Sequence, residues 1–182
     1  MAFLSQAGLK KLGFHSLGDD VQISDAARFY SPGKISIGSH VRIDDFCILS
    51  AGRGGISIGN FVHIGCFSSL LGSGEIVLAD YSGLSARVCI YSSSDDYSGA
   101  YLTNPTVPLD LREVHEAPVK LGRHAIVGAG SVILPGVTLG EGVAVGALTL
   151  VARDLDPFTI YLGVPARRVG ERRRSLLDLE NP

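Results

Sequence analysis

The sequence has no tryptophan, one methionine and three cysteines among its 182 residues. Cys47, Cys66 and Cys89 are odd in number and form no CxxC pair. This pattern excludes a disulfide framework, and a structural zinc site would lack its cysteine pairs. We therefore expect a protein of a reducing compartment, the cytoplasm.

Charge is also scarce, because only 19% of the residues are charged and the net charge is −2. A general nucleic-acid or membrane-surface binder is therefore not expected. The longest apolar runs, such as residues 147–152, fall far short of the ~20 residues of a membrane span. Residues 1–5 lack the basic start of a signal peptide. The apolar fraction of 46% excludes a disordered chain and predicts a globular one.

Glycine is abundant, at 23 residues, and an excess of glycine is typical of proteins built from internal repeats, such as the one found here. Large apolar residues, here called anchors, recur every six positions through most of the chain, in segments of three or six. The anchors are Leu17, Ile23, Phe29, Ile37, Ile43, Leu49, Ile58, Ile64, Leu70, Leu78, Leu84, Ile90, Leu121, Val127, Ile133, Leu139, Val145 and Val151. Neither the 3.6-residue period of a helix nor the two-residue period of a strand explains a strict six.

Short strands joined by tight corners do explain this period, so the sequence predicts an all-β parallel β-helix with three sides. Each anchor is expected inside, with a small residue beside it and Gly, Asn or Asp at the corners. The repeat slips only after Phe29, Leu49, Leu70 and Ile90, so one corner should receive every insertion.

We expect a single domain over residues 1–182. Its predicted parts are an N-terminal helical cap (1–16), coils (17–91), an extended loop (92–120), coils (121–163) and a C-terminal tail (164–182). Residues 3–11 are expected to form a short helix, and the tail a strand followed by a helix. Loops on one edge of a solenoid are where such proteins usually carry function.

The repeat [LIV]-G-x-x-[small]-x with its long insertion resembles the hexapeptide-repeat acyltransferases. Residues 127–140, followed by Gly-Val-Pro-Ala-Arg at 163–167, look like the sugar O-acetyltransferases related to galactoside and maltose acetyltransferase. Residues 94–99 and 102–105 are similar to a surface-polysaccharide subgroup. The resemblance implies a left-handed β-helix, a homotrimer with sites between subunits, and acetyl-CoA as co-substrate.

Cofactor-binding positions also follow from this resemblance. Ala129 and Ala147 match positions where the family's backbone contacts the pantetheine arm, although the coil itself also demands small residues there. Arg153, and Arg167 or Arg168, match basic positions near the nucleotide phosphates, which suit the planar guanidinium.

The general base does not follow from the resemblance, because residues 91–95, Tyr-Ser-Ser-Ser-Asp, replace the turn that carries the family's catalytic histidine. His63 is our first candidate, since it projects from the coil body beside anchor Ile64. His115 in the loop is second. Asp95 and Asp96 are third, although adjacent loop carboxylates more often cap a turn.

Four further residues are candidates for substrate binding. Glu75 could orient a histidine or a sugar hydroxyl, or simply cap a turn. Tyr97, Tyr101 and Asn104 make the long loop polar, which argues against an inert scaffold. No two histidines have the H-x4-H spacing of the zinc enzymes with this fold, so no metal is expected.

Three functions therefore remain open. The first is an acetyl-CoA-dependent O-acetyltransferase acting on a sugar or sugar nucleotide in surface-polysaccharide biosynthesis. The second is an N-acetyltransferase on an amino-sugar nucleotide, which fits the missing histidine because a neutral amine demands less of a base. The third is a non-catalytic β-helical scaffold trimer.

Overall fold

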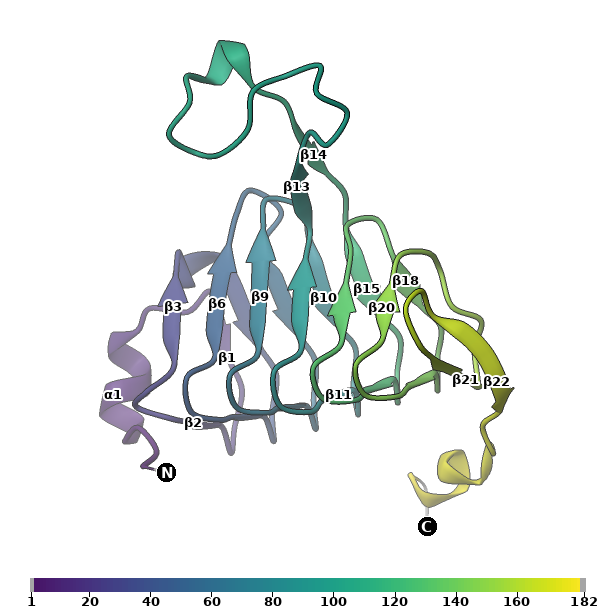
Figure 1. The fold of residues 1–182 in the computed structure, drawn as a ribbon. Coiled ribbons are helices and arrows are strands. Elements are labelled where there is room, and N and C mark those ends of the chain that lie inside the picture. Colours follow the sequence, from purple (N-terminus) through teal and green to yellow (C-terminus); the bar gives the residue numbers. More distant parts are fainter. Residues whose placement is uncertain (1, 181–182) are drawn as a thin grey trace.

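The computed structural model describes residues 2–180, and these form an all-β parallel β-helix (Figure 1). Each coil contributes one short strand to each of three parallel sheets, as the six-residue repeat predicts. The N-terminus lies at one end of the solenoid and the C-terminus at the other. This architecture is consistent with the left-handed β-helix that the family resemblance implies.

The three sheets are numbered in the order in which the chain visits them. Sheet 1 contains β1 (Ser16–Leu17), β4 (Ile35–Ile37), β7 (Ile56–Ile58), β10 (Ile76–Leu78), β15 (Val119–Leu121) and β18 (Thr138–Leu139). Sheet 2 contains β2 (Gln22–Ile23), β5 (Arg42–Ile43), β8 (His63–Ile64), β11 (Gly83–Leu84), β16 (Ile126–Val127), β19 (Ala144–Val145), β21 (Thr159–Leu162) and β22 (Arg167–Glu171). Sheet 3 contains β3 (Arg28–Tyr30), β6 (Ile48–Ala51), β9 (Ser69–Gly72), β12 (Cys89–Tyr91), β17 (Val132–Ile133) and β20 (Leu150–Val151).

The anchors form three ladders in register, one on each sheet. In sheet 3, for example, Ile90 pairs with Leu70 on one side and with Ile133 on the other. All eighteen anchors except Leu17 and Phe29 in the first coil are buried in one core. The glycines beside them allow adjacent coils to approach, since a Cβ on Gly128 would lie 2.4 Å from the backbone nitrogen of Ala147.

The corners differ from the expectation of Gly, Asn or Asp. Phe61 and Tyr81 occupy left-handed backbone conformations at the corner between sheets 1 and 2, with φ of 56° and 59°. Phe46 and Phe67 do the same between sheets 2 and 3. The rings stack from coil to coil, with centroids 4.8 Å apart for Phe61 and Tyr81. Stacking offsets the strain of a positive φ, a compensation that a propensity argument does not include.

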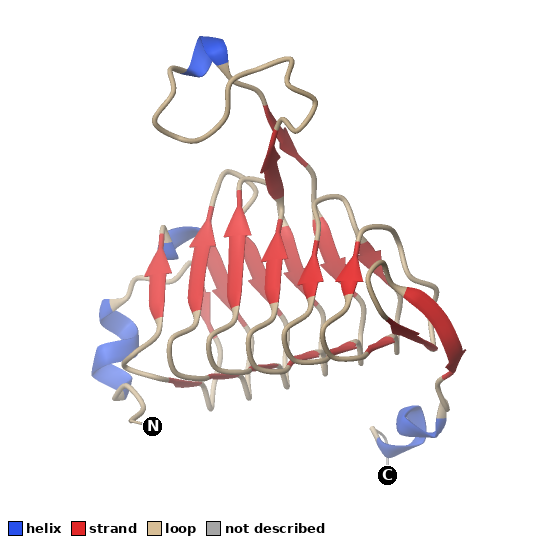
Figure 2. Cartoon of the chain, in the orientation of Figure 1, coloured by secondary structure: helices blue, strands red, loops and turns tan. Residues whose placement is uncertain are grey.

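All insertions leave at the corner between sheets 3 and 1, here called the insertion corner, as predicted. The long loop departs after β12 and returns at β15. Its stem is an antiparallel hairpin of β13 (Ser93–Asp95) and β14 (Val114–Glu116), and it also contains the 3-10 turn η2 (Leu109–Leu111). Figure 2 shows this stem lifting the loop clear of the coils.

The termini cap the solenoid with little helix. The N-terminal helix α1 (Gln6–Lys11) is shorter than predicted, because Phe3 instead bridges to Ser24, and the Ser5 side chain accepts the Gly8 N–H. The C-terminal strand β22 pairs antiparallel with β21, and the predicted helix after it is the 3-10 turn η3 (Ser175–Leu179). A further 3-10 turn, η1 (Pro32–Lys34), lies in the first insertion. Over residues 2–180, no helix has the length and hydrophobicity needed to cross a membrane.

Candidate functional site

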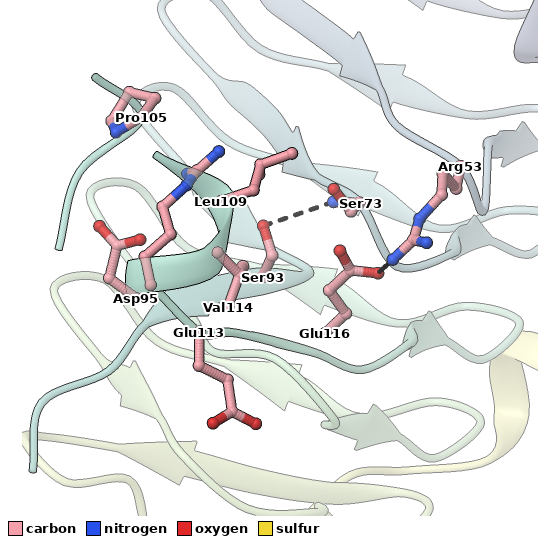
Figure 3. Close-up of a pocket in the computed structure, with 10 residues that line it drawn as sticks. Arg53, Ser73, Ser93, Asp95, Pro105, Leu109, Glu113, Val114 and Glu116 are labelled. Atoms are coloured by element: carbon pink, nitrogen blue, oxygen red, sulfur yellow. Dashed lines mark hydrogen bonds and ion pairs between the residues drawn. The ribbon is translucent and has the colours of Figure 1, made fainter. Parts of the chain in front are cut away.

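A cavity of about 600 Å³ lies at the insertion corner, between the loop and the coil edge. Its walls come from two short insertions, which contribute Arg53 and Ser73, and from the hairpin stem and the loop (Figure 3). Hydrophobic and polar groups both face it, as is typical of small-molecule sites. The lining residues are Arg53, Ser73, Ser93, Asp95, Pro105, Leu109, Arg112, Glu113, Val114 and Glu116.

A second cavity of about 370 Å³ contacts the same stem. It is lined by Tyr91, Ser93, Ser94, Asp95, Tyr97, Leu134 and Pro135. Asp95 and Ser93 therefore face both spaces. Burial, followed by the neighbouring Cys89, raises the pKa of Tyr91, so its phenol stays protonated and can donate a hydrogen bond.

The two adjacent aspartates differ in their partners. The Asp96 carboxylate accepts backbone N–H groups from Ser98, Gly99 and Tyr101. A hydrogen bond from the Ser98 side chain, followed by these backbone bonds, lowers the pKa of Asp96 to about 2. Asp95 accepts one N–H, from Asn104 at 3.2 Å. Asp96 thus organises the loop, whereas Asp95 is the carboxylate of the pair that faces both cavities.

His63 belongs to a separate cluster on sheet 2. Its Nε2 lies 2.9 Å from Asp44 Oδ2, and Arg42 Nε donates to Asp44 Oδ1 at 2.7 Å. Burial alone would raise the pKa of Asp44, but its hydrogen bonds with His63 and Arg42 lower it below its ordinary value. In a three-sided coil, sheet 2 is opposite the insertion corner. The structure therefore does not bring His63 and Asp95 together within one chain.

The other histidines also lie outside the two cavities. His115 is exposed on β14 and pairs with Ser94 across the hairpin. His124 is buried, stacks on Tyr81, and bonds to Glu180. His40 stacks on Phe61 and lies 3.0 Å from Asp20.

The predicted substrate-binding residues are dispersed. Tyr97 lines the second cavity with 93% of its surface exposed. Asn104 accepts the Thr106 N–H at a turn, and Tyr101 is exposed in the loop. Glu75 Oε2 lies 3.6 Å from Lys120 Nζ, and among residues 2–180 no contact joins Glu75 to a histidine.

The cofactor candidates divide into two groups. Arg153 and Arg167 line one cavity of about 370 Å³ with Ala152, Pro165 and Ala166. Arg168 instead lines a different cavity and donates to Glu171, because successive residues of β22 point to opposite sides. Ala129 and Ala147 are exposed at the corner between sheets 2 and 3, away from the Arg153 cavity.

The Arg153 cavity and the Asp95 stem lie on the same edge of the solenoid. Ser92, Pro135 and Arg153 each come two residues after an anchor of sheet 3, and those anchors are paired in register. Two coil steps of about 4.8 Å therefore separate the level of Arg153 from the level of Ser92. The insertion corner thus connects a basic cavity to the carboxylate of Asp95.

Sequence reasoning missed Arg53 and Arg112. Arg53 Nη2 donates to Glu116 Oε2 at 2.7 Å, which ties the second insertion to the hairpin (Figure 3). Arg53 lies on the predicted insertion corner, so that prediction carried the signal for it. Arg112 carried no such signal, because its place depends on the fold of the loop. Among the described residues, no group of three or more His, Cys, Asp or Glu could hold a metal ion.

Comparisons with known proteins identify the family. The family model for bacterial transferase hexapeptide (six repeats) matches residues 118–153. The dTDP-4-amino-4,6-dideoxy-D-glucose acyltransferase of Escherichia coli is 49% identical over 181 residues, which cover 100% of this chain and 94% of the relative. The chain belongs to the hexapeptide-repeat acyltransferases.

Two further relatives place the chain within these acyltransferases. A variant of AntD, an N-acyltransferase from Bacillus cereus, was solved with dTDP-4-amino-4,6-dideoxyglucose and coenzyme A. It superposes with a TM-score of 0.94 at 46% identity, covering 98% of this chain and 95% of AntD. The galactoside O-acetyltransferase of Escherichia coli K12 is 36% identical over 59 residues, only 32% of this chain and 29% of that enzyme. The dTDP-amino-sugar acyltransferase of Escherichia coli and AntD therefore match the loop as well as the coils.

Proposed function

We propose that this acyltransferase moves an acyl group from acyl-CoA to the amino group of a dTDP-linked amino sugar. The observation that carries the proposal is the chain-wide similarity to sugar-nucleotide N-acyltransferases, the long loop included. It favours the amide-forming alternative over the O-acetyl transfer that the motifs of the C-terminal coils favoured. The missing histidine of the loop turn supports the same choice.

Asp95 is the group that we assign to the proton transfer. The neutral amine attacks the thioester carbonyl carbon, a C–N bond forms, and the C–S bond then breaks. The proton released from nitrogen passes to the Asp95 carboxylate, and the departing thiolate of CoA takes up a proton to leave as the thiol. A carboxylate suits this step because an amine that has gained positive charge is acidic, unlike a sugar hydroxyl.

The acyl donor is assigned to the edge that joins the Arg153 cavity to Asp95. Arg153 and Arg167 would hold the nucleotide phosphates of CoA through charge-assisted hydrogen bonds. The pantetheine arm would follow the insertion corner past Leu134 and Pro135, which line the second cavity. The acyl group would then reach Tyr91 and Asp95. Ala129 and Ala147 would contribute from their own corner only where two subunits meet.

We also propose a homotrimer working on precursors of surface polysaccharides in the cytoplasm. Phe46 and Phe67 support assembly, because their stacked rings remain 55% and 50% exposed along one corner. Aromatic side chains exposed in this way are typical of protein interfaces. Sedimentation analysis tests the trimer directly.

The test of the reaction uses two acceptors that differ in one group. The purified protein is incubated with acetyl-CoA and dTDP-4-amino-4,6-dideoxyglucose, or with the matched dTDP-6-deoxyglucose that carries a hydroxyl at C4. Release of free thiol and the mass of the product are measured. We expect acylation of the amine only, as an amide. Transfer to the hydroxyl alone would restore the O-acetyl prediction, and transfer to neither would favour the scaffold.

A further inference from the structure

Arg112 lines the cavity beneath the loop, and its side chain is partly buried. Arg112 Nε is buried there, and no atom among residues 2–180 accepts a hydrogen bond from it. A buried charged donor without a partner costs free energy, which a bound acceptor would recover. Arg53, the other guanidinium of the cavity, is already paired with Glu116.

We propose that Arg112 binds the diphosphate of the nucleotide sugar in this cavity. The proposal rests on the proposed function for the identity of the ligand. A guanidinium presents a planar fork of donors that matches two phosphate oxygens, so it suits a diphosphate better than an ammonium does. The cavity is about 600 Å³, which lies within the usual range for sites that hold small molecules.

The charges of the remaining walls suit the other end of the same ligand. Asp95 and Glu113 contribute carboxylates, which can accept hydrogen bonds from sugar hydroxyls and from an amino group. Ser93 and Ser73 lie between them and Arg53, with the Ser93 hydroxyl accepting the Ser73 N–H at 3.4 Å (Figure 3). An amino-sugar nucleotide carries an anionic diphosphate and a basic amine, so its two ends match the mixed charge of the cavity.

Pro105 and Leu109 provide the apolar part of the cavity. Both come from the loop and line the same cavity as Asp95 (Figure 3), and Leu109 is 78% exposed. An exposed leucine at the mouth of a polar cavity can cover the flat face of a pyrimidine base or the methyl group of a 6-deoxy sugar. The loop thus supplies both the cation and the apolar cover, its stem supplies Ser93, and two short insertions supply Ser73 and Arg53.

The test measures binding of dTDP to the full-length protein by calorimetry, for the wild type, Arg112→Gln and Arg112→Lys. We expect wild-type binding, a loss of affinity of about tenfold or more for Arg112→Gln, and a smaller loss for Arg112→Lys. Arg28→Gln is the matched control, because Arg28 lies at the N-terminal end and donates to the carbonyls of Asp25 and Ala27. Its dTDP affinity should equal that of the wild type.

Kinetics separate this proposal from the proposed function. With the amino-sugar nucleotide as acceptor, Arg112→Gln should have a higher KM for the nucleotide sugar than the wild type and the same KM for acetyl-CoA. A folded Arg112→Gln protein that binds dTDP as tightly as the wild type overturns the inference, whether or not acyl transfer occurs. If the wild type binds dTDP through Arg112 but transfers no acyl group, the inference stands and the proposed function fails. Equal losses for dTDP and CoA would indicate a collapsed loop and also overturn it.

Discussion

Asp95 and Asp96 are consecutive in the chain, yet their carboxylates have different partners and surroundings. Asp96 accepts three backbone N–H groups of its own loop, whereas Asp95 accepts one and lines the two cavities on either side of the hairpin stem. The pKa of Asp96, about 2, makes it a poor proton acceptor. Asp96 therefore holds the loop, and Asp95 is the carboxylate of the pair to which the proposed function assigns the proton transfer.

Asp95→Asn is expected to reduce kcat by about 100-fold, the lower end of the range for a general acid–base group, with folding unchanged. Asp96→Asn should instead raise the KM for the sugar nucleotide, because the loop loses its charged acceptor. Steady-state kinetics with circular dichroism separate the two effects. Full activity of Asp95→Asn would remove Asp95 from the mechanism.

His63→Ala and His115→Ala are each expected to keep kcat within a few-fold of the wild type. Neither side chain lines the cavities at the stem, and an amine acceptor demands less of a base than a hydroxyl does. Comparison of both variants under saturating substrates tests this. A loss of 100-fold or more in His63→Ala would instead restore His63 as the base, acting from a neighbouring subunit.

Asp44 should make the free energy of unfolding decrease at acid pH. Its folded-state pKa is lowered, so its contribution is complete above the unfolded value of about 4 and is lost as pH falls through the lowered value. Asp44→Asn should lower the unfolding free energy at pH 7 by about 1 kcal/mol, a small loss because the partners of Asp44 are about half exposed. The unfolding free energy of the variant should also fall less between pH 7 and pH 3, and this dependence on pH is here called the acid limb. Urea unfolding at pH 7 and pH 3 measures both effects. Asp178→Asn is the exposed control, and an identical acid limb in both variants would contradict the prediction.

Arg153→Gln and Arg167→Gln should each raise the KM for acyl-CoA by about tenfold, as expected for a lost charge-assisted contact. CoA at 100 times its Kd should stabilise the wild type by about 2.7 kcal/mol, and the double variant should lose most of the resulting rise in Tm. Arg173→Gln, exposed in the same segment, is the control. Unchanged CoA binding in the double variant would place the donor elsewhere.

Gly128 and Gly83 should respond oppositely to alanine. A Cβ on Gly128 would lie 2.4 Å from backbone, which cannot yield, so Gly128→Ala should destabilise by about 1–3 kcal/mol. A Cβ on Gly83 meets nothing within 4 Å, so Gly83→Ala should be neutral or stabilise by up to about 1 kcal/mol. Thermal unfolding of both proteins checks the coil spacing. Equal effects of the two substitutions on Tm would contradict the close stacking of adjacent coils at Gly128.

The sequence predicted the site only in part. The insertion corner follows from where the repeat slips, and the Asp95/Asp96 pair is a candidate because it lies at the turn where the family's catalytic histidine is missing. The rigid position of His63 on the coil body favours it as the base, but sheet 2, which carries it, is opposite the loop. Arg112 was not singled out, since no local pattern marks a loop residue whose guanidinium turns into a cavity.

The sequence by itself determined the β-helix, the burial of its anchors and the corner that carries the loop. Each of these follows from a short-range repeat, because a residue's place in the six-residue period decides whether it points inward or outward. Only the tertiary structure decided which polar groups share a cavity. Pairing of β13 with β14 places Arg112 and Asp95 at one cavity, and stacking of coils aligns Arg153 with Pro135. These contacts join residues that are distant in sequence, so the six-residue repeat gives no information about them.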